Sequence, residues 1–218
     1  MQTIRDELRM VPSIVGKAPD FDWTSIPDAP RELFLRWLTV ALDAGVPEAH
    51  AATLSTVDKD GFPDARLLII KDVTDDCGFK IATSDESAKG RQLLHTPNCA
   101  LTFYWSALAR SVRVRGIAQR ASAAESAEDF LARHPQARTI ALAGTQSSVI
   151  ASDTARDQAL TQAKAALEAN PVAVSAHWAV WTIVPNSVEF WQGEPNRDHQ
   201  RVRYTRAGTM WDKQRLWP

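Results

Sequence analysis

The sequence lacks the residue clusters that carry most metal and nucleophile chemistry. It contains two cysteines, Cys77 and Cys99, whose spacing matches no metal-binding or redox motif. A Gly-rich phosphate loop and a serine nucleophile elbow are missing as well, which argues against a Rossmann-type nucleotide site. Four histidines are scattered and are interpreted as structural: His50, His95, His134 and His177.

Charge of one sign and long apolar runs are also absent. The formal net charge of −1 argues against a general nucleic-acid or membrane-surface binder, so any anion site must be local. No stretch approaches the ~18 apolar residues of a membrane span. Residues 1–9 are too charged for a signal peptide, and with so few cysteines we expect a cytoplasmic protein.

What is present is an ordinary globular composition, with 44% apolar and 23% charged residues. Its 218 residues suffice for one substantial domain. Eight tryptophans is a high count. Large flat rings suit a core, a dimer interface or a stacked cofactor, and composition leaves these three alternatives open.

The order of apolar and punctuating residues predicts the elements. Residues 1–29 carry three prolines and little periodicity, which indicates an extended arm. Pro30 then opens a helix that Gly45 closes. Further helices are predicted at 84–95 (capped by Ser84 or Asp85), at 122–133 (behind the capping box Ser122-x-x-Glu125) and at 153–169. Period-two alternation predicts strands at 52–57, 65–71, 79–83, 100–105, 111–120, 178–184, 187–191, 201–204 and 209–215.

Many short antiparallel strands with helices inserted at the edges indicate an α+β domain built on a small β-barrel. The sequence shows no internal repeat, low-complexity tract or βαβ alternation. We therefore expect one domain over residues 30–218, preceded by the arm of residues 1–29.

Basic residues in two of these elements suit an anionic ligand. Arg66 and Lys71 flank an apolar run that we expect to be buried on both faces of its strand, where unpaired cations are costly. Lys89 and Arg91 lie in the helix at 84–95, near backbone N–H groups that favour a phosphate. A solvated helix face is an equal alternative for the second pair.

The most informative stretch begins after Trp191, where a Gly/Pro/Asn turn is followed by Arg197, His199 and Arg201 at every second residue. On an extended backbone this period aims all three side chains at one face. Such groups repel one another unless an anionic or electron-rich group lies among them. A solvated edge strand is the plain alternative, but the adjacent turn and tryptophan favour a ligand site.

The runs Val188–Gly193 and Asn196–Arg201 and the closing Asp212–Pro218 resemble the C-terminal signature of the pyridoxine/pyridoxamine 5′-phosphate oxidase family. The resemblance extends back to about Pro30. It implies an antiparallel, Greek-key-like split β-barrel with peripheral helices. It also implies a homodimer, formed with the C-terminal region (about 171–218), that binds FMN in clefts at its interface.

The resemblance further implies the contacts, residue by residue. The FMN contacts would be Arg66, Leu67, Lys71, Thr83, Lys89, Ser111, Gln146, Ser147, Trp191 and Arg201. The substrate contacts would be Lys71 and Arg133 at a phosphate, and Arg197 and His199, the catalytic pair, over an aromatic ring.

The family's reaction moves a hydride from the 4′ carbon of the substrate to N5 of the flavin, and oxygen reoxidises the flavin to give hydrogen peroxide. The resemblance thus implies an FMN-dependent oxidase of a small aromatic substrate. Arg197 would supply positive charge, and His199 would orient the substrate or assist proton transfer.

The chain departs from the family pattern at three expected FMN contacts. Ala82, Ala88 and Ser111 stand where Tyr, Arg and Gln are usual. The loss of one charge-assisted hydrogen bond costs about 1.5–3 kcal/mol, so we expect FMN binding to survive.

The expected substrate-phosphate site departs further, because Asp129 and Ala137 stand where Tyr and Ser are usual. A carboxylate ~4 Å from a phosphate repels it by about 4 kcal/mol per charge pair at an effective dielectric near 20. Alternatively, Asp129 pairs with Arg133 and neutralises it. Either outcome weakens the capture of a phosphorylated substrate.

Several functions therefore stay open. Besides a vitamin B6 oxidase, the chain could be a flavin oxidase of another flat aromatic such as a phenazine precursor. It could also be a non-catalytic FMN-binding protein, although the retained Arg197 and His199 argue against mere storage. A structural dimer without cofactor is the remaining alternative, motivated by the three lost FMN contacts.

Overall fold

The structure, a computed structural model, describes residues 3–218. Its strands are β1 (Ala51–Val57), β2 (Pro63–Ile69), β3 (Asp72–Val73), β4 (Phe79–Ser84), β5 (Asn98–Trp105), β6 (Arg110–Arg120), β7 (Trp178–Gln192), β8 (Gln200–Ala207) and β9 (Met210–Arg215). Its α-helices are α1 (Ile4–Met10), α2 (Pro30–Asp43), α3 (Ala88–His95), α4 (Ala123–Leu131), α5 (Pro135–Ala143) and α6 (Asp153–Ala169), and two 3-10 turns are η1 (Trp23–Ser25) and η2 (Ser106–Leu108). The strands hydrogen-bond in the order β2-β1-β5-β6-β7-β4-β3, with β8 on β7 and β9 on β8.

The chain forms two compact units, and each is described by itself. Unit 1 comprises Met1–Thr53, Leu101–Arg115 and Pro185–Pro218, and unit 2 comprises Leu54–Ala100 and Gly116–Val184. Among residues 3–218, none of the helices combines the length and the apolar character that crossing a lipid bilayer requires.

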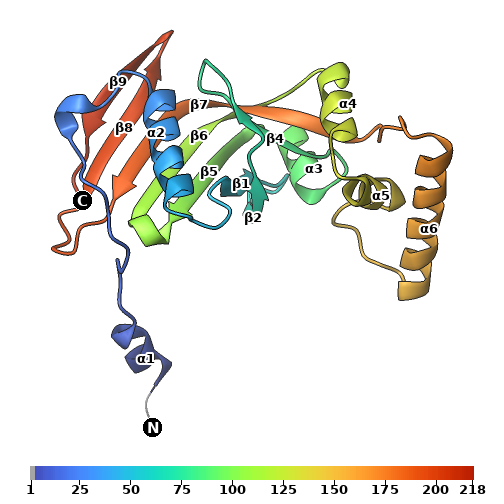
Figure 1. Cartoon of the computed structure of the whole chain (residues 1–218), viewed down its shortest axis with the longest axis horizontal. Coiled ribbons are helices and arrows are strands. Elements are labelled where there is room, and N and C mark those ends of the chain that lie inside the picture. Colours follow the sequence, from blue (N-terminus) through green and yellow to red (C-terminus); the bar gives the residue numbers. More distant parts are fainter. Residues whose placement is uncertain (1–2) are drawn as a thin grey trace. The chain divides into compact units, whose positions relative to one another are not determined.

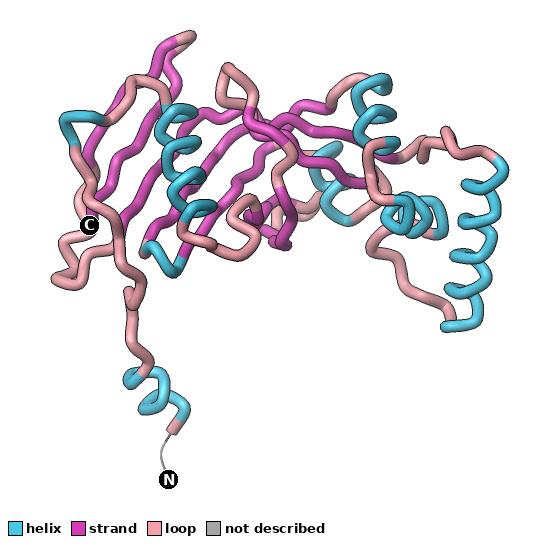
Figure 2. The backbone as a smooth tube through the Cα atoms, in the orientation of Figure 1, coloured by secondary structure: helices cyan, strands magenta, loops and turns pink. Residues whose placement is uncertain are grey.

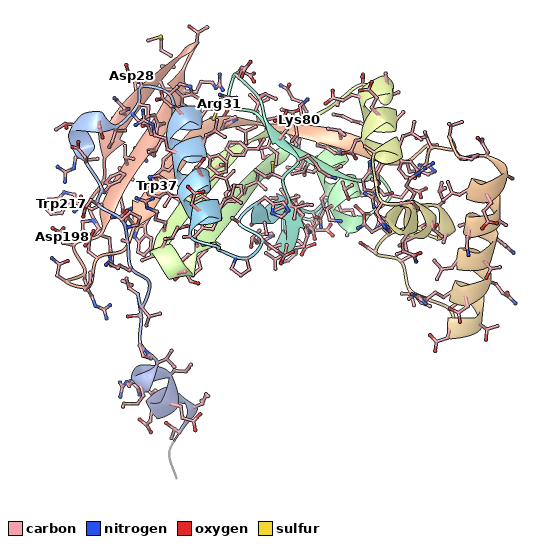
Figure 3. All side chains as sticks on the ribbon, in the orientation of Figure 1. Asp28, Arg31, Trp37, Lys80, Asp198 and Trp217 are labelled. Atoms are coloured by element: carbon pink, nitrogen blue, oxygen red, sulfur yellow. The ribbon has the colours of Figure 1, made fainter. Side chains whose placement is uncertain are left out.

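Helix α2 supplies the aromatic core of unit 1, and its Trp37 lies on the side turned to the strands (Figures 1 and 3). The Trp37 ring lies 5.2 Å from that of Phe190 on β7, and the Phe34 ring lies 5.0 Å from that of Phe103 on β5. The expected helix is confirmed: Pro30 stands in its first turn, and Gly45 follows its end at a φ of +67°.

The arm is anchored to unit 1 by hydrogen bonds to the strands and to η2. These bonds run from Lys17 N–H to the Ala107 carbonyl (3.0 Å), from Gln192 Nε2 to the Pro19 carbonyl (2.8 Å) and from the Tyr204 hydroxyl to the Pro27 carbonyl (2.8 Å). Gly16 passes so close to the Ser106 carbonyl that a Cβ atom there would overlap it. The expectation of a wholly extended arm is wrong, because Thr3 and Asp6 form a capping box that starts α1 and η1 follows.

Unit 2 joins two strands to a group of helices. Strand β4 pairs antiparallel with the first half of β7, where Thr83 faces Ala179. Helix α4 is attached to this pair because the Ser126 hydroxyl accepts a hydrogen bond from Val180 N–H at 3.1 Å. Helices α5 and α6 then lie side by side (Figure 2).

Three expectations about the elements are wrong. Strand β2 is not buried on both faces, since Leu67 is 76% and Ile69 41% exposed; β2 ends the strand order and so has a neighbour on one side only. The two strands expected at 178–184 and 187–191 form the single strand β7. Helix α3 starts later than expected, with Ser87 as its N-cap.

Gly90 provides a test of the packing at the start of α3. A Cβ atom at Gly90 would lie 2.7 Å from Asp85 Cα and closer still to the Ser84 carbonyl oxygen. We therefore expect Gly90→Ala to lower the free energy of unfolding by about 1–3 kcal/mol, measured by urea titration. Gly144→Ala, which has open space around the added methyl group, is the control and should not fall in stability. Equal midpoints for both variants would contradict the close approach.

Candidate functional site

The expected site residues fall into two clusters. Those in unit 2 are Arg66, Leu67, Lys71, Thr83, Lys89, Arg133, Gln146 and Ser147. Those in unit 1 are Ser111, Trp191, Arg197, His199 and Arg201. The contacts within each unit show which of these residues lie together.

Lys89 is the most unusual residue of unit 2. Its side chain is 9% exposed, yet its ammonium contacts a neutral partner, the Thr83 hydroxyl, at 3.3 Å. The same hydroxyl lies 3.1 Å from Gln146 Oε1, so these three residues converge. Burial, and secondly the positive charge of Arg66, lowers the pKa of Lys89, whereas Asp64 opposes this shift. No carboxylate is paired with Lys89 in the part of the chain that the structure describes, so a bound anion would relieve the cost of burying this charge.

Arg66 is fixed in place by its neighbours on β1, β2 and α3. Its guanidinium donates to the Thr56 hydroxyl and, at 2.9 Å, to Gln92 Oε1, and it pairs with Asp64. The Arg66 side chain is 18% exposed, so these bonds orient it before any ligand arrives. By contrast Leu67, its neighbour on β2, is largely exposed.

A cavity of about 770 Å³ opens in unit 2 beside this cationic centre. Four expected site residues line it: Lys71, Arg133, Gln146 and Ser147. Most of the remaining lining is apolar and includes Ile69, Ala82, Ile140, Val149, Ile150, Leu160 and Trp178. Ser147 has a φ of +73°, a strained conformation for a residue with a side chain, which is common at ligand sites.

The pairing of Asp129 differs from the expectation that it neutralises Arg133. Asp129 Oδ1 lies 3.6 Å from the Lys71 ammonium, and Oδ2 accepts a hydrogen bond from Trp178 Nε1 at 2.8 Å. Arg133 instead stacks on Trp178, with Cζ 3.8 Å from the ring centroid, and donates to the Ala137 carbonyl at 3.3 Å. Asp129 thus lies closer to Lys71 than to Arg133, although Arg133 is one helical turn further along the chain. The sequence spacing could not show this.

The cluster in unit 1 is built around Trp191 and a turn. The rings of Trp191 and His199 lie 5.0 Å apart, and His199 Nδ1 accepts a hydrogen bond from Glu194 N–H at 3.1 Å. The expectation that Arg197, His199 and Arg201 alternate on an extended backbone is wrong, because Arg197 has a φ of +69° and β8 starts at Gln200. The turn folds His199 back onto Trp191.

Glu189 on β7 holds two arginines in unit 1. Arg201 donates to its Oε1 from Nε (3.1 Å) and Nη2 (2.6 Å), and Arg113 pairs with Oε2. The Glu189 side chain is 9% exposed, so this pairing fixes Arg201 firmly. Ser111, two residues before Arg113, donates a hydrogen bond from its hydroxyl to the Phe103 carbonyl at 2.9 Å.

Sequence reasoning missed four residues that organise the two clusters: Asp64, Gln92, Trp178 and Glu189. Gln92, Trp178 and Glu189 make their contacts with residues distant in the sequence or across a strand pair. Two contacts left a signal in the sequence: Asp64 lies two residues before Arg66 on the same strand, and Glu189 and Arg201 flank the turn that was singled out. Among residues 3–218, no group of three or more His, Cys, Asp or Glu side chains could hold a metal ion.

Comparison with known proteins identifies the family of the chain. The family model described as "Pyridoxamine 5′-phosphate oxidase" matches residues 38–178, and the model of the "Pyridoxine 5′-phosphate oxidase C-terminal dimerisation region" matches residues 178–218. A pyridoxine/pyridoxamine 5′-phosphate oxidase of Thermosynechococcus vestitus is 43% identical over 189 residues, which are 87% of this chain and 89% of that protein. The corresponding oxidase of Burkholderia mallei is 43% identical over 185 residues, which are 84% of this chain and 86% of that protein. The chain belongs to the pyridoxine/pyridoxamine 5′-phosphate oxidase family, as the resemblance implied.

Solved structures support the expected α+β split-barrel fold. PhzG from Burkholderia lata 383, in complex with tetrahydrophenazine-1-carboxylic acid, has a TM-score of 0.85 and 26% identity, covering 93% of this chain and 100% of that one. A pyridoxamine 5′-phosphate oxidase-related, FMN-binding protein from Nostoc punctiforme has a TM-score of 0.71 and 16% identity, covering 88% and 100%. With the antiparallel sheet and its peripheral helices, these structures confirm the fold class.

Glu189→Gln tests the anchoring of Arg201. The amide keeps the shape but removes the negative charge that two arginines share, so we expect a loss of about 1–3 kcal/mol in the free energy of unfolding, measured by urea titration. Glu128→Gln, which removes the same charge from an exposed position on α4, is the control and should leave the midpoint unchanged. If both variants behave alike, the pairing of Glu189 does not stabilise unit 1.

Proposed function

We propose that the protein is an FMN-dependent oxidase that converts pyridoxine or pyridoxamine 5′-phosphate into the 4′-aldehyde. In the pyridoxine case two electrons and two protons leave the CH2OH group and reduce oxygen to hydrogen peroxide. In the pyridoxamine case the same oxidation of the CH2NH2 group gives an imine, which water hydrolyses to the aldehyde with release of ammonia. Membership of the family supports this function. The observation that carries it in this chain is the buried ammonium of Lys89, which forms no ion pair with a carboxylate among the described residues.

The residues of unit 2 suit the phosphate end of FMN. Lys89 and the oriented guanidinium of Arg66 provide positive charge, and Thr83, Gln146 and Ser147 add hydrogen-bonding groups. These are the donors that bind phosphate groups best, because charge-assisted hydrogen bonds are roughly twice as strong as neutral ones. FMN, when bound, supplies the acceptor for two electrons that oxygen regenerates.

The residues of unit 1 suit the ring end of the reaction. Trp191 offers a flat apolar surface beside His199. Because Glu194 N–H donates to Nδ1 of His199, a neutral imidazole carries its proton on Nε2 and presents a donor there. Arg197 contributes a cation on the turn beside Trp191 and His199, so it can stabilise negative charge that develops during the reaction.

A homodimer completes the proposal. The C-terminal region matches a dimerisation region, and it contains Trp191, Arg197, His199 and Arg201. We propose that each FMN molecule contacts both chains, so that the two clusters of one site need not come from a single chain. An exposed edge strand β2 is compatible with burial against a second copy.

A second candidate is the oxidation of a flat aromatic carboxylate of the phenazine type. Two observations favour it: the similar solved structure of PhzG contains tetrahydrophenazine-1-carboxylic acid, and Asp129 occupies Lys71 at the expected phosphate position. At this end of the molecule the two candidates differ in the anionic group, a phosphate in one and a carboxylate in the other.

The test is an aerobic assay of purified, FMN-loaded protein with hydrogen peroxide as the readout. We expect absorbance near ~450 nm from bound flavin and peroxide formation with pyridoxine or pyridoxamine 5′-phosphate. Peroxide formation with a reduced phenazine carboxylate, and none with the B6 phosphates, would select the second candidate. A protein that retains no FMN would rule out both.

Lys89 can be tested separately from turnover. We expect Lys89→Met to weaken FMN binding roughly 10–150-fold, the equivalent of one lost charge-assisted hydrogen bond. The measurement is the quenching of FMN fluorescence on binding. Lys59→Met, which removes an exposed lysine from the β1–β2 turn, is the matched control and should bind FMN as the unaltered protein does. An unchanged dissociation constant for Lys89→Met would mean that Lys89 does not contact the cofactor.

A further inference from the structure

Asp129 places a negative charge behind one end of the cavity in unit 2. Both of its carboxylate oxygens are used, one by the Lys71 ammonium at 3.6 Å and the other by Trp178 Nε1 at 2.8 Å. Its side chain is 17% exposed, and that of Lys71 is 35% exposed. Charges at this degree of burial are screened less than those on an open surface.

Arg133 is the other cation at this end of the cavity. Its guanidinium lies flat on Trp178, and one of its nitrogens donates to the Ala137 carbonyl. Its Nε is shielded from solvent and has no partner among the described groups. Burial lowers the pKa of Arg133, and the nearby charge of Asp129 opposes this shift. Arg133 is therefore held in place with hydrogen-bonding capacity left for a ligand.

Two further arginines are left out of the charge at this end of the cavity. Arg138 is not among the residues that line the cavity, and it donates to the carbonyls of Pro171 and Ala173. Arg156 lines the cavity from α6 but pairs with Asp157, and both side chains are more than half exposed. In such an exposed position a charge contributes little.

The charges at this end thus add up to a single positive charge, because Lys71 and Arg133 contribute two and Asp129 removes one. A phosphate monoester carries a charge of about −1.5 to −2 at neutral pH. A carboxylate carries one negative charge, which this end can neutralise. Asp129 repels a doubly charged group about twice as strongly as a singly charged one, since the Coulomb energy scales with the charge.

We infer that Asp129 is a specificity-determining residue that lowers the preference of this cavity for a phosphate monoester over a singly charged aromatic anion. The inference rests on the proposed function in one respect, which is that the cavity receives the anionic end of the oxidase's substrate. It adds the residue that shifts the site from the phosphate of the first candidate towards the single carboxylate of the second, namely Asp129.

The experiment compares phenyl phosphate with benzoate, two probes that share a ring and differ in charge at pH 8. Their dissociation constants are measured by calorimetry on the FMN-loaded protein. Asp129→Asn keeps an oxygen for Trp178 Nε1 while removing the charge. We expect it to tighten benzoate about threefold and phenyl phosphate about tenfold, because the second effect is the square of the first.

Glu128→Gln is the matched control, since it removes one negative charge from the same helix at an exposed position. It should change both constants less than twofold. Equal changes for the two probes with Asp129→Asn, or no change, would overturn the inference. So would the absence of phenyl phosphate binding in every variant.

Lys71→Met gives a second line of evidence if Asp129→Asn folds poorly. Lys71→Met removes the positive charge that offsets Asp129, so it should weaken phenyl phosphate about tenfold and benzoate about threefold, the reverse of Asp129→Asn. Equal losses for the two probes, or no loss, would contradict the inference. These binding measurements need no turnover, so their failure is distinct from a failure to form peroxide, which would count against the proposed function.

Discussion

The cost of burying a positive charge without a partner governs this structure. Lys89 lies almost out of reach of solvent, with the Thr83 hydroxyl as its neutral neighbour and Arg66 close enough to add repulsion. A folded chain tolerates such an arrangement when something else compensates it, and here the compensation has to arrive from outside. An anion that binds beside Lys89 would therefore also stabilise the folded state of unit 2.

The buried cations of unit 1, by contrast, have partners within the chain. Glu189 pairs with Arg113 and Arg201, and Arg110 lies 4.2 Å from the centre of the Trp37 ring while its Nε donates to Gln192. Burial still lowers the pKa of Arg110, to about 10, but aromatic and hydrogen-bonding partners are provided by the chain itself. The buried cations Arg110 and Arg201 of unit 1 thus have partners within the chain, whereas Lys89 in unit 2 is paired with no carboxylate among the described residues.

Local sequence patterns predicted the helices and strands well where capping residues, proline, glycine or alternation determine them. The proline and glycine that bound α2, the Ser122 cap of α4 and the alternation of β6 all appear as expected. The failures share another cause. Whether β2 is an edge strand, whether Asp129 meets Lys71, and whether Arg197 adopts a positive φ depend on neighbours distant in the sequence. The family signature identified the chemistry, but the pairing of each charge had to come from the structure.

The close approach at Gly16 has a consequence for how the sequence of the arm can vary. Since a single methyl group would collide with the Ser106 carbonyl, this position fixes the point at which the chain joins the folded body of unit 1. Upstream of it, α1 buries no residue and contributes nothing to the core. Residues 4–10 can therefore diverge at little thermodynamic cost, whereas Ile14, just before Gly16, still packs beside Gly193.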